Sequence, residues 1–490
     1  MLRVVRNVKF KTNVNFVSSR NITSQTIDEW NSLISSRGFT ARDDETKVGP
    51  DNILSGTTFI AKDNIATTKE PTTCASCMLD NYYSPFDATV ISLLEEQGST
   101  MVGKANLDEF GMGSANVNSY YGHAVNPLFT EEEHITGGSS GGSAASIQSD
   151  LATFSLGTDT GGSVRLPASY CGIVGLKPTY GRISRWGVIP YAQSLDTVGI
   201  LAKDVETVQK VFKVLDKHDP KDPTSLPTEF REELKKEKQK YQKNRSQLVF
   251  GVPDEFLVAE LSQGTREHWS HMLSTIQDMG HIVRRVSIPS IKKSISAYLA
   301  LATAEASSNL SRYDGVRFGF NTNNLKDSPL ELIAENRSTS LGLEVQRRII
   351  LGNYTMSAGS GNHYFKATDE RRDIVEDYNE ILNFPNLLMN EPGESSSEKC
   401  DIIVTPTAMS GPLSVEEYLR HDRENFLNSY VNDILTVPAS LAGMPAISIP
   451  WNTPGTDSSI PQGMHLMAQF GDDHFLLDFA AELMKVNSTT

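Results

Sequence analysis

Cysteine is scarce in this chain, and so are long apolar runs and positive charge. Only four cysteines occur in 490 residues, too few for a disulfide framework, which indicates a reducing compartment. No apolar run approaches the ~20 residues that a membrane-spanning helix needs. Acidic residues outnumber basic ones by 60 to 45, for a net charge of −15. This balance argues against a broad basic face, so any RNA would be held mainly by a partner.

Motifs for metals, phosphates and dinucleotides are incomplete. Cys74 and Cys77 have the spacing of a zinc knuckle, but no second Cys or His pair at zinc-like spacing accompanies them. Neither of the glycine-rich loops at residues 137–142 and 157–163 ends with the lysine of a phosphate-binding P-loop. Gly111 and Gly113 lack the third glycine of a dinucleotide fingerprint. We therefore expect no metal and no cofactor in this chain.

The first 27 residues differ in composition from the rest. They contain five basic residues and no acidic one, together with several Ser, Thr and Asn. This composition is typical of a mitochondrial transit peptide. We predict a targeting segment over residues 1–27 and localisation in the mitochondrial matrix; a basic arm without a targeting role is the alternative.

Strand-like and helical patterns alternate through the remaining chain. Residues 57–61 and 151–156 are β-prone, whereas residues 88–97 and 204–215 carry apolar side chains at helical spacing. The alternation predicts an α/β fold with a mixed, largely parallel central sheet covered by helices on both faces. We expect a single domain over residues 28–490. It would contain a charged insertion at 220–246 and a mainly helical insertion at about 290–388.

Two glycine-rich loops, at residues 137–142 and 157–163, form the candidate site. The first carries Ser139 between glycines and the second ends on Ser163. Glycine clusters let successive backbone N–H groups point at an anion, as in an oxyanion hole. The letters around Ser139 also fit a nucleophile elbow, but that turn must follow a buried strand, and residues 130–136 are too polar. An elbow at Ser139 is therefore disfavoured.

A serine nucleophile needs a base. None of the ten histidines lies in either loop, although folding can bring a distant histidine close. The other candidate is Lys62, because burial can lower a lysine pKa until the neutral amine is available. In this hypothesis Ser163 attacks an acyl carbon and Ser139 relays its proton to Lys62. The oxyanion would be bound by backbone N–H groups around Thr160, Gly161 and Gly162.

These motifs resemble the amidase signature family. Four segments carry the resemblance: residues 59–63, 137–142, 157–167 and 171–179. It implies the amidase signature fold and a catalytic triad of Ser163 as nucleophile, Ser139 in a cis peptide as relay, and Lys62 as base. An acyl ester would form on Ser163.

Residues 106–114 and 177–187 are most similar to one branch of that family, the glutamine-hydrolysing subunits of tRNA-dependent amidotransferases. Residues 307–315 and 347–352 extend the similarity. The resemblance implies release of ammonia from glutamine for the formation of Gln-tRNA(Gln) in mitochondrial protein biosynthesis. A B-like partner would bind ATP, Mg²⁺ and Glu-tRNA(Gln), and a small accessory subunit could join the complex.

The same resemblance suggests a glutamine pocket. Arg371 is expected to bind the α-carboxylate, Asp433 the α-amino group and Tyr313 to line the pocket. Two alternatives remain open: a free-standing amidase for another small amide, and an assembly subunit without catalysis. An α/β-hydrolase mechanism would instead require a histidine and leave Lys62 dispensable.

Overall fold

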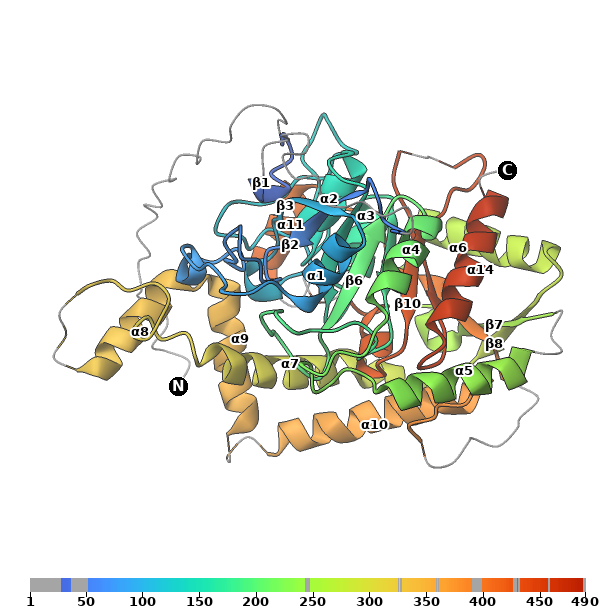
Figure 1. Ribbon diagram of the computed structural model, residues 1–490. Helices are drawn as coiled ribbons and strands as arrows, with labels where there is room; N and C mark the ends of the chain where they lie inside the picture. Colours follow the sequence, from blue (N-terminus) through green and yellow to red (C-terminus); the bar gives the residue numbers. More distant parts are fainter. Residues whose placement is uncertain are drawn as a thin grey trace.

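A mixed eleven-stranded sheet runs through the described part of the chain (Figure 1). The computed structural model describes residues 28–36, 52–242, 247–324, 326, 328–357, 359, 361–389, 399–425, 430, 432–456 and 459–487. The predicted leader at 1–27 lies outside these residues, as does the end of the predicted charged insertion. The strands lie in the order β1-β3-β2-β4-β6-β5-β10-β11-β9-β7-β8.

The strands are β1 (Leu33–Ser36), β2 (Thr58–Lys62), β3 (Thr100–Ala105), β4 (Phe154–Asp159), β5 (Val174–Lys177), β6 (Thr197–Ala202), β7 (Val249–Pro253), β8 (Ile282–Val286), β9 (Ile402–Pro406), β10 (Ala446–Pro450) and β11 (Gly463–Met467). The helices used below are α1 (Thr89–Glu96), α2 (Gly141–Gln148), α3 (Arg165–Tyr170), α4 (Val205–Leu215), α5 (Thr228–Gln242), α6 (Gln263–Asp278), α7 (Ser294–Leu310), α8 (Pro329–Ser340), α9 (Leu343–Met356), α10 (His363–Ile381), α11 (Val415–Glu424), α13 (Val437–Leu441) and α14 (Asp473–Asn487).

The predicted α/β class and mixed sheet are confirmed, but the sheet is not largely parallel. Parallel pairing is confined to its two flanks, where β2 pairs with β3 and β4, and β7 pairs with β8 and β9. The other six pairings are antiparallel. Two of these pairings come from β6, an unpredicted strand between β4 and β5 that runs antiparallel to both. The other four involve β1, β10 and β11.

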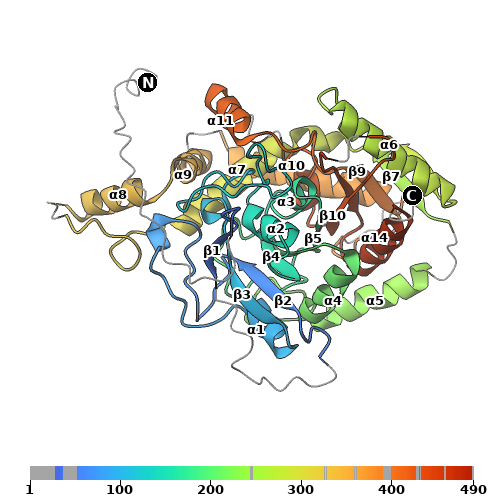
Figure 2. The ribbon, with the colours of Figure 1, turned by 90° about the horizontal axis from the view of Figure 1, so that it is seen from above.

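Helices cover both faces of the sheet, as predicted (Figure 2). Neighbouring residues of β6 divide between the two faces because strand side chains alternate. Ile200 belongs to the core that α4 and α14 cover, whereas Leu201 packs with Ala144 of α2 and Ala168 of α3. Asp204 caps the N-terminus of α4, and its carboxylate accepts a hydrogen bond from Thr207 N at 2.7 Å.

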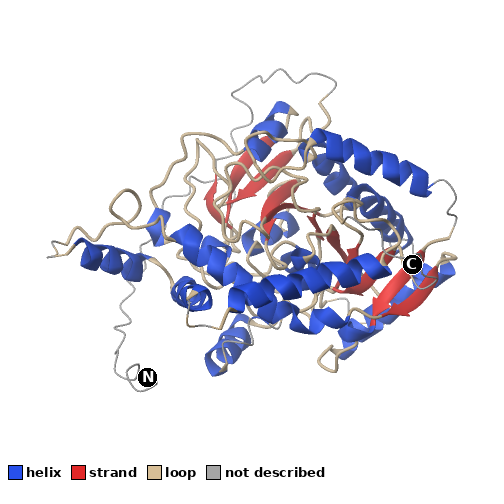
Figure 3. Cartoon of the chain, turned by 90° about the horizontal axis from the view of Figure 1, so that it is seen from below, coloured by secondary structure: helices blue, strands red, loops and turns tan. Residues whose placement is uncertain are grey.

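The span predicted as a helical insertion contains α7, α8, α9 and α10. Seen from below, long helices cross in front of the strands (Figure 3). The span predicted as a charged insertion contains α5. Within the described ranges, no helix is both long and apolar enough to span a bilayer.

A buried ion pair anchors the loop that follows β2. Lys104 Nζ lies 2.9 Å from Asp63 Oδ1, and both side chains are fully buried. Lys104 Nζ also donates to Pro71 O at 3.0 Å. The second oxygen of Asp63 accepts a hydrogen bond from Thr73 N at 2.8 Å. Because Asp63 directly follows Lys62, the pair fixes the backbone next to the candidate base.

We expect Lys104→Ala to lower the free energy of unfolding by about 3–5 kcal/mol, because it leaves the Asp63 carboxylate buried without its counter-ion. Urea unfolding followed by circular dichroism measures the change. Lys203→Ala is the matched control, since the Lys203–Asp150 pair is solvent-exposed and should cost at most about 1 kcal/mol. Equal effects of the two substitutions would contradict a structural role for the buried pair.

Candidate functional site

Lys62, at the end of β2, reaches both serines of the first glycine loop. Its Nζ donates hydrogen bonds to Ser139 Oγ and Ser140 Oγ, each at 2.8 Å. A third bond goes to the carbonyl of Thr158 at 3.2 Å. The structure therefore brings together a lysine and a serine that are 77 positions apart in the sequence.

The Lys62 amine is fully buried, and burial lowers its pKa to about 7. Nearby carboxylates oppose this shift, Asp108 most strongly, because they favour the ammonium form. A substantial fraction of neutral amine is consequently present at neutral pH. The amine can then accept a proton from a hydroxyl group.

The first loop is tightly confined around Ser139. The Gly138–Ser139 peptide bond is cis, as the family resemblance implies. A Cβ atom on Gly138 would lie 2.2 Å from Asp108 Oδ2, so only glycine fits there. Ser140 N donates to Ser163 O at 3.1 Å, and this bond joins the two glycine loops directly.

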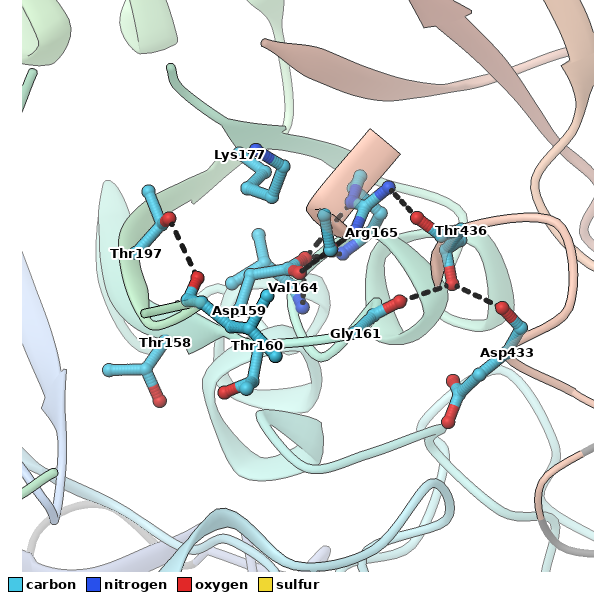
Figure 4. Close-up of polar contacts among 12 residues, drawn as sticks. Thr158, Asp159, Thr160, Gly161, Val164, Arg165, Lys177, Thr197, Asp433 and Thr436 are labelled. Atoms are coloured by element: carbon cyan, nitrogen blue, oxygen red, sulfur yellow. Dashed lines mark hydrogen bonds and ion pairs between the residues drawn. The ribbon is translucent and has the colours of Figure 1, made fainter. Parts of the chain in front are cut away.

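Ser163 ends the second loop just before α3 and is 8% exposed. Asp159, at the end of β4, supports this loop by accepting a hydrogen bond from Val164 N at 3.1 Å. It also binds Arg165 through Nε at 3.0 Å and Nη2 at 2.9 Å (Figure 4). This two-point contact between buried charges fixes the start of α3.

Thr436, from the C-terminal half of the chain, holds the peptide between Gly161 and Gly162. Arg165 Nη1 donates to Thr436 O at 2.8 Å, and Thr436 Oγ1 donates to Gly161 O at 2.7 Å (Figure 4). Because a peptide unit is planar, holding the Gly161 carbonyl turns the Gly162 N–H away from Thr436. The loop thus presents a fixed N–H group, as an oxyanion hole requires.

Thr160 is fixed by a carboxylate that sequence analysis missed. Its Oγ1 donates to Asp196 Oδ1 at 2.7 Å. The second oxygen of Asp196 accepts hydrogen bonds from Tyr191 N and Ala192 N. Burial raises the pKa of Asp196 to about 6. Asp196 directly precedes β6, so the prediction that omitted this strand also omitted its carboxylate.

Asp433, predicted as a pocket residue, lies beside the second glycine loop. A Cβ atom on Gly162 would be 3.3 Å from Asp433 Oδ1, and Ser114 Oγ donates to Asp433 Oδ2 at 2.6 Å. Burial raises the pKa of Asp433 to about 6, while Ser114 and the positive charge of Arg348 lower it. A cationic ligand group would stabilise the ionised form further.

Arg371 does not share this location, in contrast to the prediction. Its Nε donates to Leu441 O at 2.8 Å, and its terminal nitrogens donate to Ser194 Oγ and Ser194 O at 3.1 and 3.0 Å. The guanidinium therefore braces α10 against the end of α13.

Besides Arg165, the arginine whose charge acts on Asp433 is Arg348 of α9, not Arg371. It is 4% exposed, and its Nη1 donates to Tyr191 Oη at 2.7 Å. Its guanidinium lies 5.6 and 5.3 Å from the ring centroids of Tyr191 and Tyr430. Residues 347–352 were singled out in the sequence, but the letters did not distinguish the buried arginine from its neighbour.

Tyr313 also lies elsewhere than predicted. Its ring packs 5.3 Å from that of Phe110 and lines a cavity of about 1030 Å³ that neither Lys62 nor Ser163 lines. The tyrosine at the second loop is Tyr298 of α7, because a Cβ atom on Gly161 would be 2.8 Å from its Cζ. The two tyrosines are close in sequence, and only the fold separates their positions.

The alternative mechanism, in which a histidine acts as the base, has no supporting contact at Ser139 or Ser140 in the part of the chain that the structure describes. Within the described residues, no histidine hydrogen-bonds to Lys62, Ser139 or Ser140. His465 contacts Arg165 Nη1 at 3.1 Å through its Nε2, and burial keeps its pKa well below the usual range. His465 therefore contacts the arginine that fixes the start of α3 and is placed to support the second loop.

Comparisons with known proteins identify the relatives of this chain. Residues 35–477 match the family model described as Amidase. The chain is 53% identical over 93% of its length to the mitochondrial A-type subunit of glutamyl-tRNA(Gln) amidotransferase from Candida albicans (strain SC5314 / ATCC MYA-2876), covering 96% of that protein. It is 44% identical to the protein of the same name from Yarrowia lipolytica, over 89% of this chain and 95% of the relative.

Solved structures show the same fold. The crystal structure of the A-type subunit of glutamyl-tRNA(Gln) amidotransferase from Thermotoga maritima superposes with a TM-score of 0.71 at 34% identity, covering 94% of this chain and 88% of that one. Allophanate hydrolase from Kluyveromyces lactis shares the fold with a TM-score of 0.72 at 24% identity, over 95% and 68% of the two chains. The predicted family is thus confirmed, and the chain belongs to the amidase family.

Proposed function

We propose that this chain is the glutaminase component, the A-type subunit, of a mitochondrial glutamyl-tRNA(Gln) amidotransferase. The observation that carries the proposal is the buried Lys62 amine, 2.8 Å from Ser139 Oγ, within loops joined to Ser163. The relatives that bear this name match the chain over nearly their whole length. Their mitochondrial location agrees with the basic, acid-free composition of residues 1–27.

In the proposed mechanism, Ser163 Oγ attacks the amide carbon of glutamine. Its proton passes to Ser139 Oγ while Ser139 gives its own proton to the neutral Lys62 amine. The tetrahedral oxyanion is bound by backbone N–H groups of residues 160–162. Collapse of the intermediate transfers a proton through Ser139 to the leaving nitrogen, releases ammonia and leaves a glutamyl ester on Ser163. Water then hydrolyses the ester by the same relay.

The charged ends of glutamine find complementary groups beside the second loop. Asp433 is proposed to bind the α-ammonium group, and Ser114 holds its carboxylate in position. Arg348 takes the role first assigned to Arg371 and binds the α-carboxylate, because it is buried and its charge acts on Asp433. Tyr298, packed on Gly161, lines the pocket between them.

The released ammonia is proposed to serve a B-like partner. That partner would bind ATP, Mg²⁺ and Glu-tRNA(Gln), and a small accessory subunit could complete the assembly. A net charge of −15 supports the assignment of tRNA binding to the partner, because an acidic chain is poorly suited to hold tRNA by itself.

The first prediction concerns the nucleophile. Ser163→Ala should lower ammonia release from glutamine at least about a thousandfold, because no other group can form the ester. Ammonia release by the assembled enzyme measures the effect, and Ser274→Ala on the exposed face of α6 serves as control. Rapid hydrolysis of other amides by the isolated chain, with glutamine inert, would instead identify a free-standing amidase. Unchanged turnover in Ser163→Ala would contradict the mechanism.

The pH dependence of kcat/KM provides a second prediction. The Lys62 pKa near 7 means that the amine is protonated, and inactive as a base, at lower pH. Activity should therefore fall about tenfold per pH unit below about 7. Below about 6, protonation of Asp433 should make the fall steeper. Glutaramate, which lacks the α-amino group, should show the first decline but not the second; an identical profile for both substrates would exclude Asp433 as the ammonium partner.

The third prediction separates the two arginines. Arg348→Met should raise the KM for glutamine at least about tenfold, equivalent to about 1.4 kcal/mol of binding, with a smaller effect on kcat. Arg371→Met should leave KM within about threefold and lower thermal stability, because its guanidinium only braces carbonyls. Steady-state kinetics of both variants test this assignment; thermal melts do not separate them, because Arg348→Met also removes the buried ion pair of Arg348 with Glu344. The opposite pattern would restore the original choice of Arg371.

A further inference from the structure

Glu109 is a buried carboxylate that the mechanism above does not use. It is 4% exposed. Its Oε1 accepts a hydrogen bond from Ser76 Oγ, and its Oε2 accepts one from Gly342 N at 2.7 Å. No Lys, Arg or His of the described chain forms an ion pair with it. A buried carboxylate needs donors that satisfy it, so these two contacts define what the side chain can do.

The contact with Gly342 lies at the N-terminus of α9. Gly342 is the N-cap residue of this helix and has no side chain that could cap it. Glu109 comes from 233 positions earlier in the chain, and its carboxylate lies where the helix dipole favours negative charge. A Cβ atom on Gly342 would be 2.4 Å from Glu109 Oε2. The close approach of α9 to this carboxylate therefore requires glycine.

Helix α9 carries Arg348, the arginine proposed to bind the α-carboxylate of glutamine. Arg348 follows Gly342 by less than two helical turns. Between them lies Glu344, which accepts a hydrogen bond from Arg348 Nε at 2.8 Å. Since all three residues belong to the first turns of one helix, a shift of its N-terminus would move Arg348 as well.

The backbone on either side of Glu109 is joined to the catalytic loops. Asp108 N donates to the carbonyl of Ser139, the proposed relay, at 3.2 Å. Phe110 N donates to Cys74 O at 2.9 Å, in the loop that follows β2. Glu109 therefore connects α9 to backbone that is itself fixed to the relay serine and to the loop after the base.

We propose that Glu109 is a positioning residue for glutamine: by holding the N-terminus of α9 against the loop of Ser139, it sets where Arg348 meets the substrate carboxylate. The inference rests on the proposed function, because that function assigns Arg348 to glutamine. The amide carbon must lie at Ser163 while the carboxylate at the other end of the substrate is bound. The separation between α9 and the serine loops must therefore match the length of glutamine.

The contact does not depend on the charge of Glu109. Burial raises its pKa to about 7, so both forms are present at neutral pH. The ionised form accepts both hydrogen bonds, whereas the neutral acid can accept from Gly342 N and donate to Ser76 Oγ. Glu109→Gln can keep both bonds in the same way, through its carbonyl oxygen and its NH₂ group. Glu109→Ala removes both.

Steady-state ammonia release by the assembled enzyme tests the positioning role. Glu109→Ala should raise the KM for glutamine at least about tenfold and change kcat less than about threefold. Glu109→Gln should restore the KM to within about threefold of the wild-type value. Glu331→Ala, at an exposed position in the first turn of α8, is the matched control and should behave like the wild type.

Two further variants separate positioning from a general loss of structure. Gly342→Ala should also raise the KM severalfold, because its methyl group displaces the Glu109 carboxylate from α9. In the Arg348→Met background, Glu109→Ala should add less than about a twofold change in KM, because the arginine through which it acts is gone. If Glu109→Ala fails to fold in thermal melts, Gly342→Ala and Glu109→Gln decide the question.

Four results would overturn the positioning role. These are an unchanged KM in Glu109→Ala or Gly342→Ala, a loss of kcat as large as the rise in KM, equal damage by Glu109→Gln and Glu109→Ala, and an undiminished effect of Glu109→Ala in the Arg348→Met background. A wild-type complex that releases no ammonia from glutamine would instead overturn the proposed function.

Discussion

The burial of the Lys62 amine is the constraint on which the site depends. All three of its hydrogen bonds go to uncharged oxygens, those of Ser139, Ser140 and Thr158. The carboxylates that favour its charged form act on it only through space, because each binds other groups: Asp108 accepts from Asn116 N and Asn118 N, Asp159 binds Arg165, and Asp196 accepts from Thr160. A lysine in such a place loses much of its preference for the charged form. The fold thereby supplies a base at neutral pH without a histidine.

Adjacent parallel strands bring the parts of the site together. Lys62 ends β2, and the second glycine loop begins at the end of the neighbouring β4. The unpredicted β6 follows Asp196, which reaches back to Thr160. The C-terminal half of the chain closes the site through Thr436, which holds the Gly161 carbonyl. Each contact fixes the backbone of a loop whose glycines would otherwise be free to move.

Sequence reasoning succeeded where the chemistry is local in the chain and failed where distant segments meet. Ser139 and Ser163 could be predicted because each lies in a glycine-rich motif that is contiguous in the sequence. The antiparallel middle of the sheet, formed by β6, β10 and β11 with their neighbours, depends on how distant strands pair. Arg348 and Arg371 both lie on polar helices, and only tertiary contacts distinguish them. Arg348 is buried and bonds to Glu344 and Tyr191, whereas Arg371 bonds to backbone carbonyls. Tertiary contacts likewise distinguish Tyr298, which packs on Gly161, from Tyr313, which packs on Phe110.

The most direct test of this account is rapid-quench mass spectrometry of the assembled enzyme mixed with glutamine. The account predicts a glutamyl ester on the peptide that contains Ser163, which forms before ammonia release reaches its steady rate and is absent from Ser163→Ala. A glutamyl adduct on Ser139 or Ser140, or steady ammonia release by Ser163→Ala, would contradict the central claim that Ser163 attacks and Lys62 removes the proton.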